Sequence, residues 1–191
     1  MLPALDWFAE LASGDDRRAE RASEALARLG PRSLPRLLQL LESDTADLRW
    51  WAVRCLAGIH EARADRALVE ALGDPHLAVR QAAALALRQR PLADAIPPLL
   101  ALLGWDDALL SRLAGDALAA CGAAATAALS LAAKDPAPAI RIGAVRALAM
   151  NDDPGAIPAL YAALEDTSAM VEYWASEGLE RRGLGMVYFQ P

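Results

Sequence analysis

The sequence contains few of the residues on which most enzymes and metal sites depend. Histidine occurs only as His60 and His76, cysteine only as Cys55 and Cys121, and Lys134 is the single lysine. There is no His-x-x-x-His or Cys-x-x-Cys pair and no carboxylate cluster with the spacing of metal ligands. A glycine-rich phosphate loop and a nucleophile elbow are also absent. The sequence therefore predicts no metal, no cofactor and no catalytic residue, and it favours a protein that is not an enzyme.

Other absences limit the fold class and the partners. Alternating runs of β-branched residues are lacking, so no strand is predicted. Acidic residues outnumber basic ones by 25 to 19, for a net charge of -6, which disfavours binding to nucleic acid. No stretch approaches the roughly 20 apolar residues of a membrane span. The chain starts without the basic region and the long apolar run of a signal peptide, so none is predicted. We expect a cytoplasmic protein without a nucleic-acid or membrane partner.

What the sequence does contain is a repeat. An alanine followed four residues later by a leucine recurs every 30 or 31 residues, with a small residue directly before the leucine. These positions share one face of a helix, and the small residue lets a neighbouring helix approach closely. The alanines are Ala22, Ala52, Ala83, Ala114, Ala144 and Ala175, the small residues are Ala25, Cys55, Ala86, Ala117, Ala147 and Gly178, and the leucines are Leu26, Leu56, Leu87, Leu118, Leu148 and Leu179. The repeat predicts a stack of similar helices.

A turn precedes each of these helices, which we call the second helices. The turn residues, which we expect to act as helix N-caps, are Ser13, Ser43, Asp74, Trp105, Asp135 and Asp166. Proline follows two of the aspartates and is expected at the first helical position. Trp105 lacks a suitable acceptor, so Asp106 or Asp107 is expected to cap that helix. A leucine-rich first helix precedes each turn, so each repeat is predicted to be a helix pair.

The motif Asp74…Val79-Arg80…Ala83-Ala84…Ala86-Leu87, repeated closely at residues 135–148, resembles HEAT-like repeats of the short subtype found in phycobilisome bilin lyases. The resemblance covers roughly residues 2–183. It implies an all-α fold, a right-handed α-α superhelix (α-solenoid) of about six HEAT-like helix pairs in a single domain, residues 1–183. The expected repeats are residues 2–30, 31–60, 61–90, 91–122, 123–151 and 152–183. An apolar tail, residues 184–191, is expected to cap the last repeat.

Solenoid geometry also bears on the cysteines. Repeats of a solenoid contact only their neighbours, so Cys55 and Cys121 are expected to lie too far apart for a disulfide. We interpret both as reduced, small buried side chains of an intracellular protein.

An acidic residue at the helix start recurs together with an arginine on the same helix. The pairs are Asp44 with Arg49, Asp74 with Arg80, and Asp135 with Arg141. The resemblance implies that such pairs form a structural ladder that links adjacent repeats. Ser111 and Glu172 replace the arginine in the fourth and sixth repeats, so the ladder is expected to be interrupted there.

The far face of the second helices is unusual for surface helices. At about 100° per residue, three positions per helix point away from the packed face. In HEAT-like stacks the second helices line the concave surface, so these positions are expected to line a groove. They hold interface-forming residues where a structural helix would carry charge. The candidates are Trp50, Trp51, Arg54, Leu85, Arg112, Arg146, Tyr173 and Trp174. For Trp51 and Trp174 the alternative is packing between adjacent helices.

These observations favour a non-enzymatic scaffold that binds a protein segment or helix in the concave groove. The resemblance implies an alternative, a tetrapyrrole (bilin) lyase or chromophore chaperone subunit, whose aromatic groove and arginines would hold the pigment and its propionates. A third alternative is a purely structural or oligomerisation module.

Overall fold

The computed structural model describes residues 6–185, and within this range it contains twelve α-helices, four short 3₁₀-helices and no strands. The chain divides into two compact units, residues 1–90 and 91–191, which are described in turn. The predicted all-α fold of successive helix pairs is confirmed.

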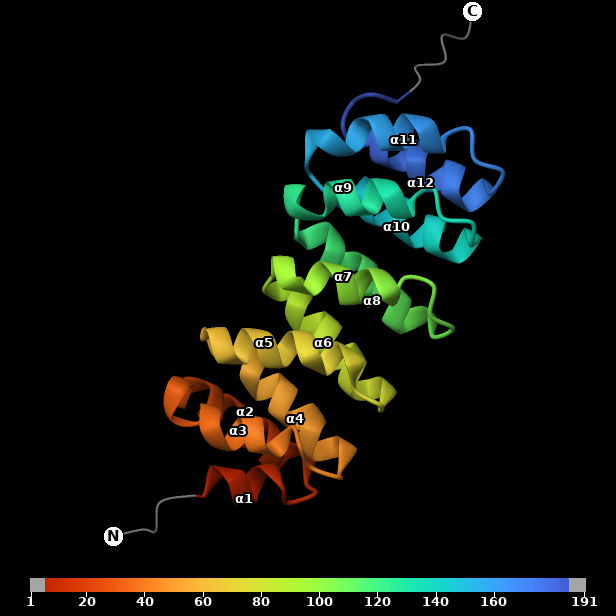
Figure 1. Cartoon of the computed structure of the whole chain (residues 1–191). Helices are drawn as coiled ribbons and strands as arrows, with labels where there is room; N and C mark the ends of the chain where they lie inside the picture. Colours follow the sequence, from red (N-terminus) through yellow and green to blue (C-terminus); the bar gives the residue numbers. More distant parts are fainter. Residues whose placement is uncertain (1–5, 186–191) are drawn as a thin grey trace, which may run out of the picture. The chain divides into compact units, whose positions relative to one another are not determined.

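Unit 1 contains three helix pairs (Figure 1, red to yellow). The pairs are α1 (Trp7–Leu11) with α2 (Asp16–Leu29), α3 (Leu34–Leu40) with α4 (Ala46–Ala57), and α5 (Ala62–Glu70) with α6 (Leu77–Gln89). The 3₁₀-helices η1 (Gly30–Arg32) and η2 (Ala71–Gly73) lie beside α3 and α5. The second helices form one layer, in which α4 packs between α2 and α6.

Unit 2 repeats this arrangement (Figure 1, green to blue). Its pairs are α7 (Ile96–Ala101) with α8 (Ala108–Ala120), α9 (Ala123–Ala132) with α10 (Pro138–Met150), and α11 (Ile157–Ala163) with α12 (Ala169–Glu180). The 3₁₀-helices η3 (Ala93–Ala95) and η4 (Pro154–Ala156) lead into α7 and α11. Here α10 packs between α8 and α12.

The repeated alanines and leucines form the core of both units. Ala52 and Leu56 of α4 and their counterparts Ala144 and Leu148 of α10 have no exposed surface. The small residue directly before each leucine explains how closely the helices pack. A Cβ atom added to Gly178 would lie 2.8 Å from Cα and Cβ of Ala149 in the preceding repeat. The repeated residue types therefore occupy the positions at which neighbouring helices are in contact.

The helix starts differ from the expectation. Asp74 was expected to be an N-cap, but α6 begins at Leu77, and Oδ1 of Asp74 accepts a hydrogen bond from the backbone N–H of His76 instead (2.7 Å). Asp135 similarly accepts from Ala137 N–H (2.8 Å). These side chains stabilise the turn two residues before the cap, an Asx-turn arrangement. In the fourth repeat Asp107 is the cap, as expected, and accepts from Leu110 N–H at 2.7 Å.

A ladder of arginines and aspartates links adjacent repeats within each unit. The Arg49 guanidinium forms two hydrogen bonds to the Asp74 carboxylate of the next repeat, at 2.7 and 2.9 Å. In unit 2, Arg141 binds Asp166 in the same way, at 2.8 and 3.0 Å. Each arginine also donates to a carbonyl of its own turn, so it ties two turns together; for Arg49 this is Ser43 O at 2.8 Å.

The pairing within the ladder corrects the prediction from the sequence. Asp74 was paired with Arg80 and Asp135 with Arg141 because each pair lies on one helix. Instead, Arg80 donates to the backbone carbonyl of Asp74 (2.7 Å), and Arg141 donates to that of Asp135 (3.0 Å). Each guanidinium thus binds a backbone carbonyl of its own turn and not the carboxylate of that turn. The Asp74 carboxylate instead binds Arg49.

A second set of links joins successive repeats at the opposite ends of the second helices. In unit 1, Arg90 donates to Ile59 O of the preceding repeat. In unit 2, Asn151 donates to Gly122 O at 2.9 Å, and Arg182 donates to Leu148 O at 3.0 Å. Burial lowers the pKa of the Arg182 guanidinium, since the surroundings disfavour its charge. Of these acceptors, Leu148 lies in the last turn of α10, where a helix leaves carbonyls without an intrahelical partner.

The predicted cap over the last repeat, residues 184–191, lies mostly outside the described residues. The described part ends after α12, where Leu184 N–H donates to Leu179 O at 2.9 Å.

Candidate binding surface of the second helices

The predicted groove residues all lie on second helices. We use the name second-helix surface for the solvent-facing residues of α2, α4 and α6 in unit 1 and of α8, α10 and α12 in unit 2. Among them, Leu85, Arg54, Arg112 and Tyr173 are exposed, with Leu85 at 39% and Tyr173 at 51%. The half-buried members are Trp50, Trp51, Arg146 and Trp174. Each unit brings some of these side chains into contact.

In unit 1, Trp50 and Trp51 of α4 form an edge-to-face pair with ring centroids 4.7 Å apart. The Arg54 guanidinium lies over both rings, at 5.1 Å from the Trp50 centroid and 5.7 Å from that of Trp51. It also forms an ion pair of 2.6 Å with Glu20 of α2. Cation–π attraction and the ion pair together hold the guanidinium against the indoles. Neither tryptophan is fully buried, so both indoles contribute to the surface.

A pocket of about 610 Å³ lies next to this cluster and is formed by unit 1 alone. We call it the tryptophan pocket, because Trp50 and Trp51 line it together with apolar residues that include Leu11 and Leu48. Four carboxylates also line it, and none of its described lining residues is basic. The carboxylates belong to Asp15, Asp16, Glu20 and Asp47.

In unit 2 the corresponding positions of α12 hold Tyr173 and Trp174, whose ring centroids lie 5.2 Å apart. The Arg146 guanidinium of α10 lies 5.5 Å from the Trp174 centroid. It forms a 2.7 Å ion pair with Asp116 of α8, and both side chains are largely buried (17% and 13% exposed). Arg146 therefore joins three second helices, and Asp116 balances its charge, whereas Arg112 is exposed.

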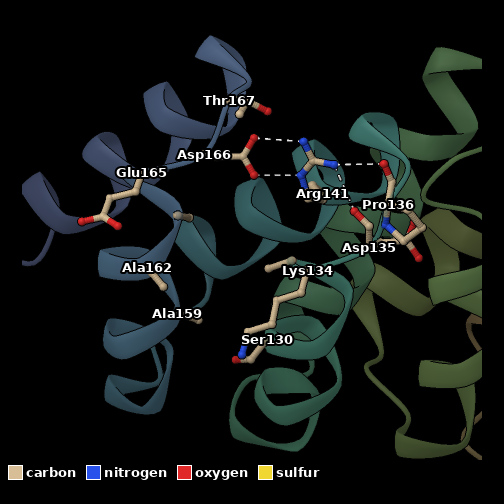
Figure 2. Close-up of a pocket in the computed structure, with 12 residues that line it drawn as sticks. Ser130, Lys134, Asp135, Pro136, Arg141, Ala159, Ala162, Glu165, Asp166 and Thr167 are labelled. Atoms are coloured by element: carbon tan, nitrogen blue, oxygen red, sulfur yellow. Dashed lines mark hydrogen bonds and ion pairs between the residues drawn. The ribbon is translucent and has the colours of Figure 1, made fainter.

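A second pocket, of about 600 Å³, lies beside the Arg141–Asp166 ion pair in unit 2 (Figure 2). Ala133 at the C-cap of α9 and alanines of α11 form part of its wall, and Lys134 and Glu165 are exposed residues that also line it. The Arg141 hydrogen bonds lower the pKa of Asp166, and the partial burial of this carboxylate opposes the shift. Arg141 and Asp166, which line this pocket, are thus paired with each other in the ladder.

Within residues 6–185, no group of three or more His, Cys, Asp or Glu side chains is placed to hold a metal ion. In the same range, no helix combines the length and the apolar character needed to traverse a bilayer. Cys55 and Cys121 are free thiols, the first buried and the second half-buried.

Comparison with known proteins agrees with this architecture. A family model of HEAT repeats matches residues 4–88, 34–119 and 125–184. The chain belongs to the HEAT-repeat family. No curated protein sequence matches it.

Solved structures similar to this HEAT-repeat protein are helical-repeat proteins. YibA of E. coli has a TM-score of 0.61 at 19% identity, over 95% of this chain and 72% of that one. CpcE and CpcF of phycocyanin lyase from Nostoc sp. PCC7120, solved as a complex, give 0.57 at 23%, over 93% and 77%. A designed armadillo repeat protein in complex with the peptide (KR)4 gives 0.50 at 20%, over 91% and 97%. These likenesses confirm the predicted α-solenoid fold.

Exposed apolar residues of this HEAT-repeat protein's second-helix surface that escaped the sequence analysis include Leu109 and Met170. Leu109 of α8 is 43% exposed and Met170 of α12 is 49% exposed. Each lies three residues before a predicted groove residue, Arg112 and Tyr173, and so extends the same face by one turn. Starting the search one turn earlier on each helix would have found both.

Proposed function

We propose that this HEAT-repeat protein is a non-enzymatic scaffold that binds a protein segment on its second-helix surface. The observation that supports this most is the aromatic pair Trp50–Trp51, which lines an open pocket although the core of α4 is already filled by alanine, valine, cysteine and leucine. Indole rings that are only half covered lose water-exposed apolar area when a partner docks, which favours binding. Tryptophan, tyrosine and arginine are also the residues that most often dominate binding energy at interfaces.

Two of the structural neighbours bear on this proposal as analogies. The designed armadillo repeat protein was solved with a bound peptide, and CpcE and CpcF were solved as a complex. Both are helical-repeat proteins solved with a peptide or protein partner, and the present proposal extends that use to this chain.

A chromophore-binding role is less well supported by the charges. The propionates of a tetrapyrrole require cationic partners. The tryptophan pocket supplies carboxylates instead, and Arg146 is already paired with Asp116. Adding a bilin and recording its visible absorbance tests this alternative, and a red or blue shift on binding would support it against the scaffold.

The scaffold is tested with a displayed library of random peptides selected on the full chain. Trp50→Ala and Trp174→Ala are expected to weaken binding of the selected segments by about tenfold or more, as anchor residues do. Leu131→Ala is the matched control, because Leu131 is a 75% exposed apolar residue on a first helix. Thermal unfolding checks that each variant is folded. Segments that bind all three variants as well as the parent would contradict the proposal.

A further inference from the structure

The tryptophan pocket has a charge that indicates what it binds. Asp15, Asp16 and Asp47 are exposed at its edge, and Glu20 is half-buried. The pocket lies at the N-terminal ends of α2 and α4, where the helix dipoles contribute about half a positive charge each. When Arg54 is counted against Glu20, the three remaining carboxylates still outweigh these partial charges. The residues that line the pocket therefore carry a net negative charge.

The chain itself shows how these residues hold a cation. The Arg54 guanidinium lies over both indoles and binds the Glu20 carboxylate at 2.6 Å. Arg54 does not line the pocket, whereas Trp50, Trp51 and Glu20 do. Arg54 thus contacts the aromatic pair from outside the lining of the pocket. The lining itself presents carboxylates, and its described residues include no arginine or lysine.

The carboxylates retain acceptor atoms for a ligand. Oδ1 of Asp15 accepts a hydrogen bond from the backbone N–H of Arg18 at 3.0 Å, which leaves its second oxygen for another donor. Asp16 and Asp47 lie in the first turns of α2 and α4 and are exposed. A planar guanidinium can stack on an indole while donating to two carboxylates, which an ammonium does less well.

We infer that the tryptophan pocket receives an arginine side chain from a basic segment of the partner protein. This inference rests on the proposed scaffold function and names the chemistry of the segment it binds. The guanidinium stacks against the Trp50–Trp51 pair, and Asp15, Asp16 and Asp47 balance its charge. Binding weakens as salt rises, because exposed charges are screened over about 8 Å at physiological ionic strength.

The experiment uses the full chain and a short, end-blocked arginine-rich peptide, measured by isothermal titration calorimetry. The triple variant Asp15→Asn, Asp16→Asn, Asp47→Asn removes three charges, keeps side-chain shape and retains a capping residue for α2. The expected result is about tenfold weaker binding. The matched control Asp94→Asn, Asp106→Asn, Glu172→Gln makes the same change in net charge at exposed sites in unit 2 and is expected to bind nearly as well as the parent.

A peptide with citrulline in place of arginine separates charge from shape. It is expected to bind much more weakly than the arginine peptide, and a lysine peptide is expected to fall between them. Equal binding of the citrulline peptide, or equal loss in both triple variants, would overturn the inference. If library-selected segments still depend on Trp50 while the arginine peptide does not bind, the scaffold stands and the basic partner is wrong. If neither behaves as expected, both proposals fail.

Discussion

Arg49 and Asp74 lie 25 residues apart and join successive repeats through a two-pronged ion pair whose N–O distances are 2.7 and 2.9 Å. Both side chains are mostly shielded from water, at 12% and 10% exposed. The same guanidinium holds Ser43 O, and the same carboxylate accepts His76 N–H, so this one contact orders two turns.

The first prediction is that removing either partner of this pair destabilises unit 1. Arg49→Ala leaves a shielded carboxylate unpaired, and we expect the free energy of unfolding to fall by about 1–3 kcal/mol. Urea denaturation followed by circular dichroism measures the change. A double-mutant cycle with Asp74→Ala isolates the pair, and strictly additive single effects would show that the two side chains do not interact in solution.

The second prediction concerns pH. Partial burial raises the pKa of Asp74, but hydrogen bonds from Arg49 and His76 N–H outweigh it, so the folded-state pKa lies below the usual value. A lowered pKa contributes stability above about pH 4, and this contribution is lost as the pH falls through the folded-state value. The stability difference between the parent and Asp74→Asn, measured in urea, should therefore be larger at about pH 7 than at about pH 3. A difference that grows on acidification would contradict this assignment.

The helix pairs were predictable because one geometric rule repeats along the chain. Each alanine–leucine pair faces a neighbouring helix, and that requirement leaves the same residue types at the same spacing. The ladder of arginines and aspartates was recognised only by its residue types. Arg49 was assigned to Asp44 rather than to Asp74, because the long arginine side chain spans repeats and nothing in a linear spacing indicates its direction.

The second set of links could not be found in this way. Arg90, Asn151 and Arg182 occupy similar places after a second helix and reach a carbonyl of the preceding repeat, yet two different side-chain types do this work. A search for repeated residue types misses repeated geometry.

The tryptophan pocket was only partly predicted for a similar reason. Trp50 was identified from its angle on α4, whereas Asp15 and Asp16 belong to the start of another helix.

The third prediction tests the small residue of the repeat. A methyl group added by Gly178→Ala would meet Ala149 at 2.8 Å and Cδ1 of Leu160 at 3.0 Å. Because the Ala149 contact includes backbone, the helices must move apart, and we expect a loss of about 1–3 kcal/mol in thermal or urea unfolding. Gly73→Ala is the control, since nothing lies within 4 Å of its added Cβ. Equal stability of the two variants would mean that α12 has room to shift.

The last prediction separates the two thiols by their burial. Cys55 has no exposed surface, and burial raises the pKa of its thiol to about 11, with the hydrogen bond to Ser23 opposing the shift. At about pH 8 roughly one thiol in a thousand would be ionised even if reagent could reach it. Cys121 is only half-buried, and its pKa is raised by less complete burial.

A thiol reagent such as Ellman's, added to the Cys121→Ala and Cys55→Ala variants, measures each site alone. We expect Cys121 to react readily, and Cys55 to react only at the rate at which α4 and its neighbours open. Urea below the unfolding midpoint should accelerate the reaction of Cys55 far more than that of Cys121, because only Cys55 requires helices to separate. Equal rates in native buffer would show that α2 and α4 part easily, and the close packing inferred from the repeat would then be wrong for unit 1.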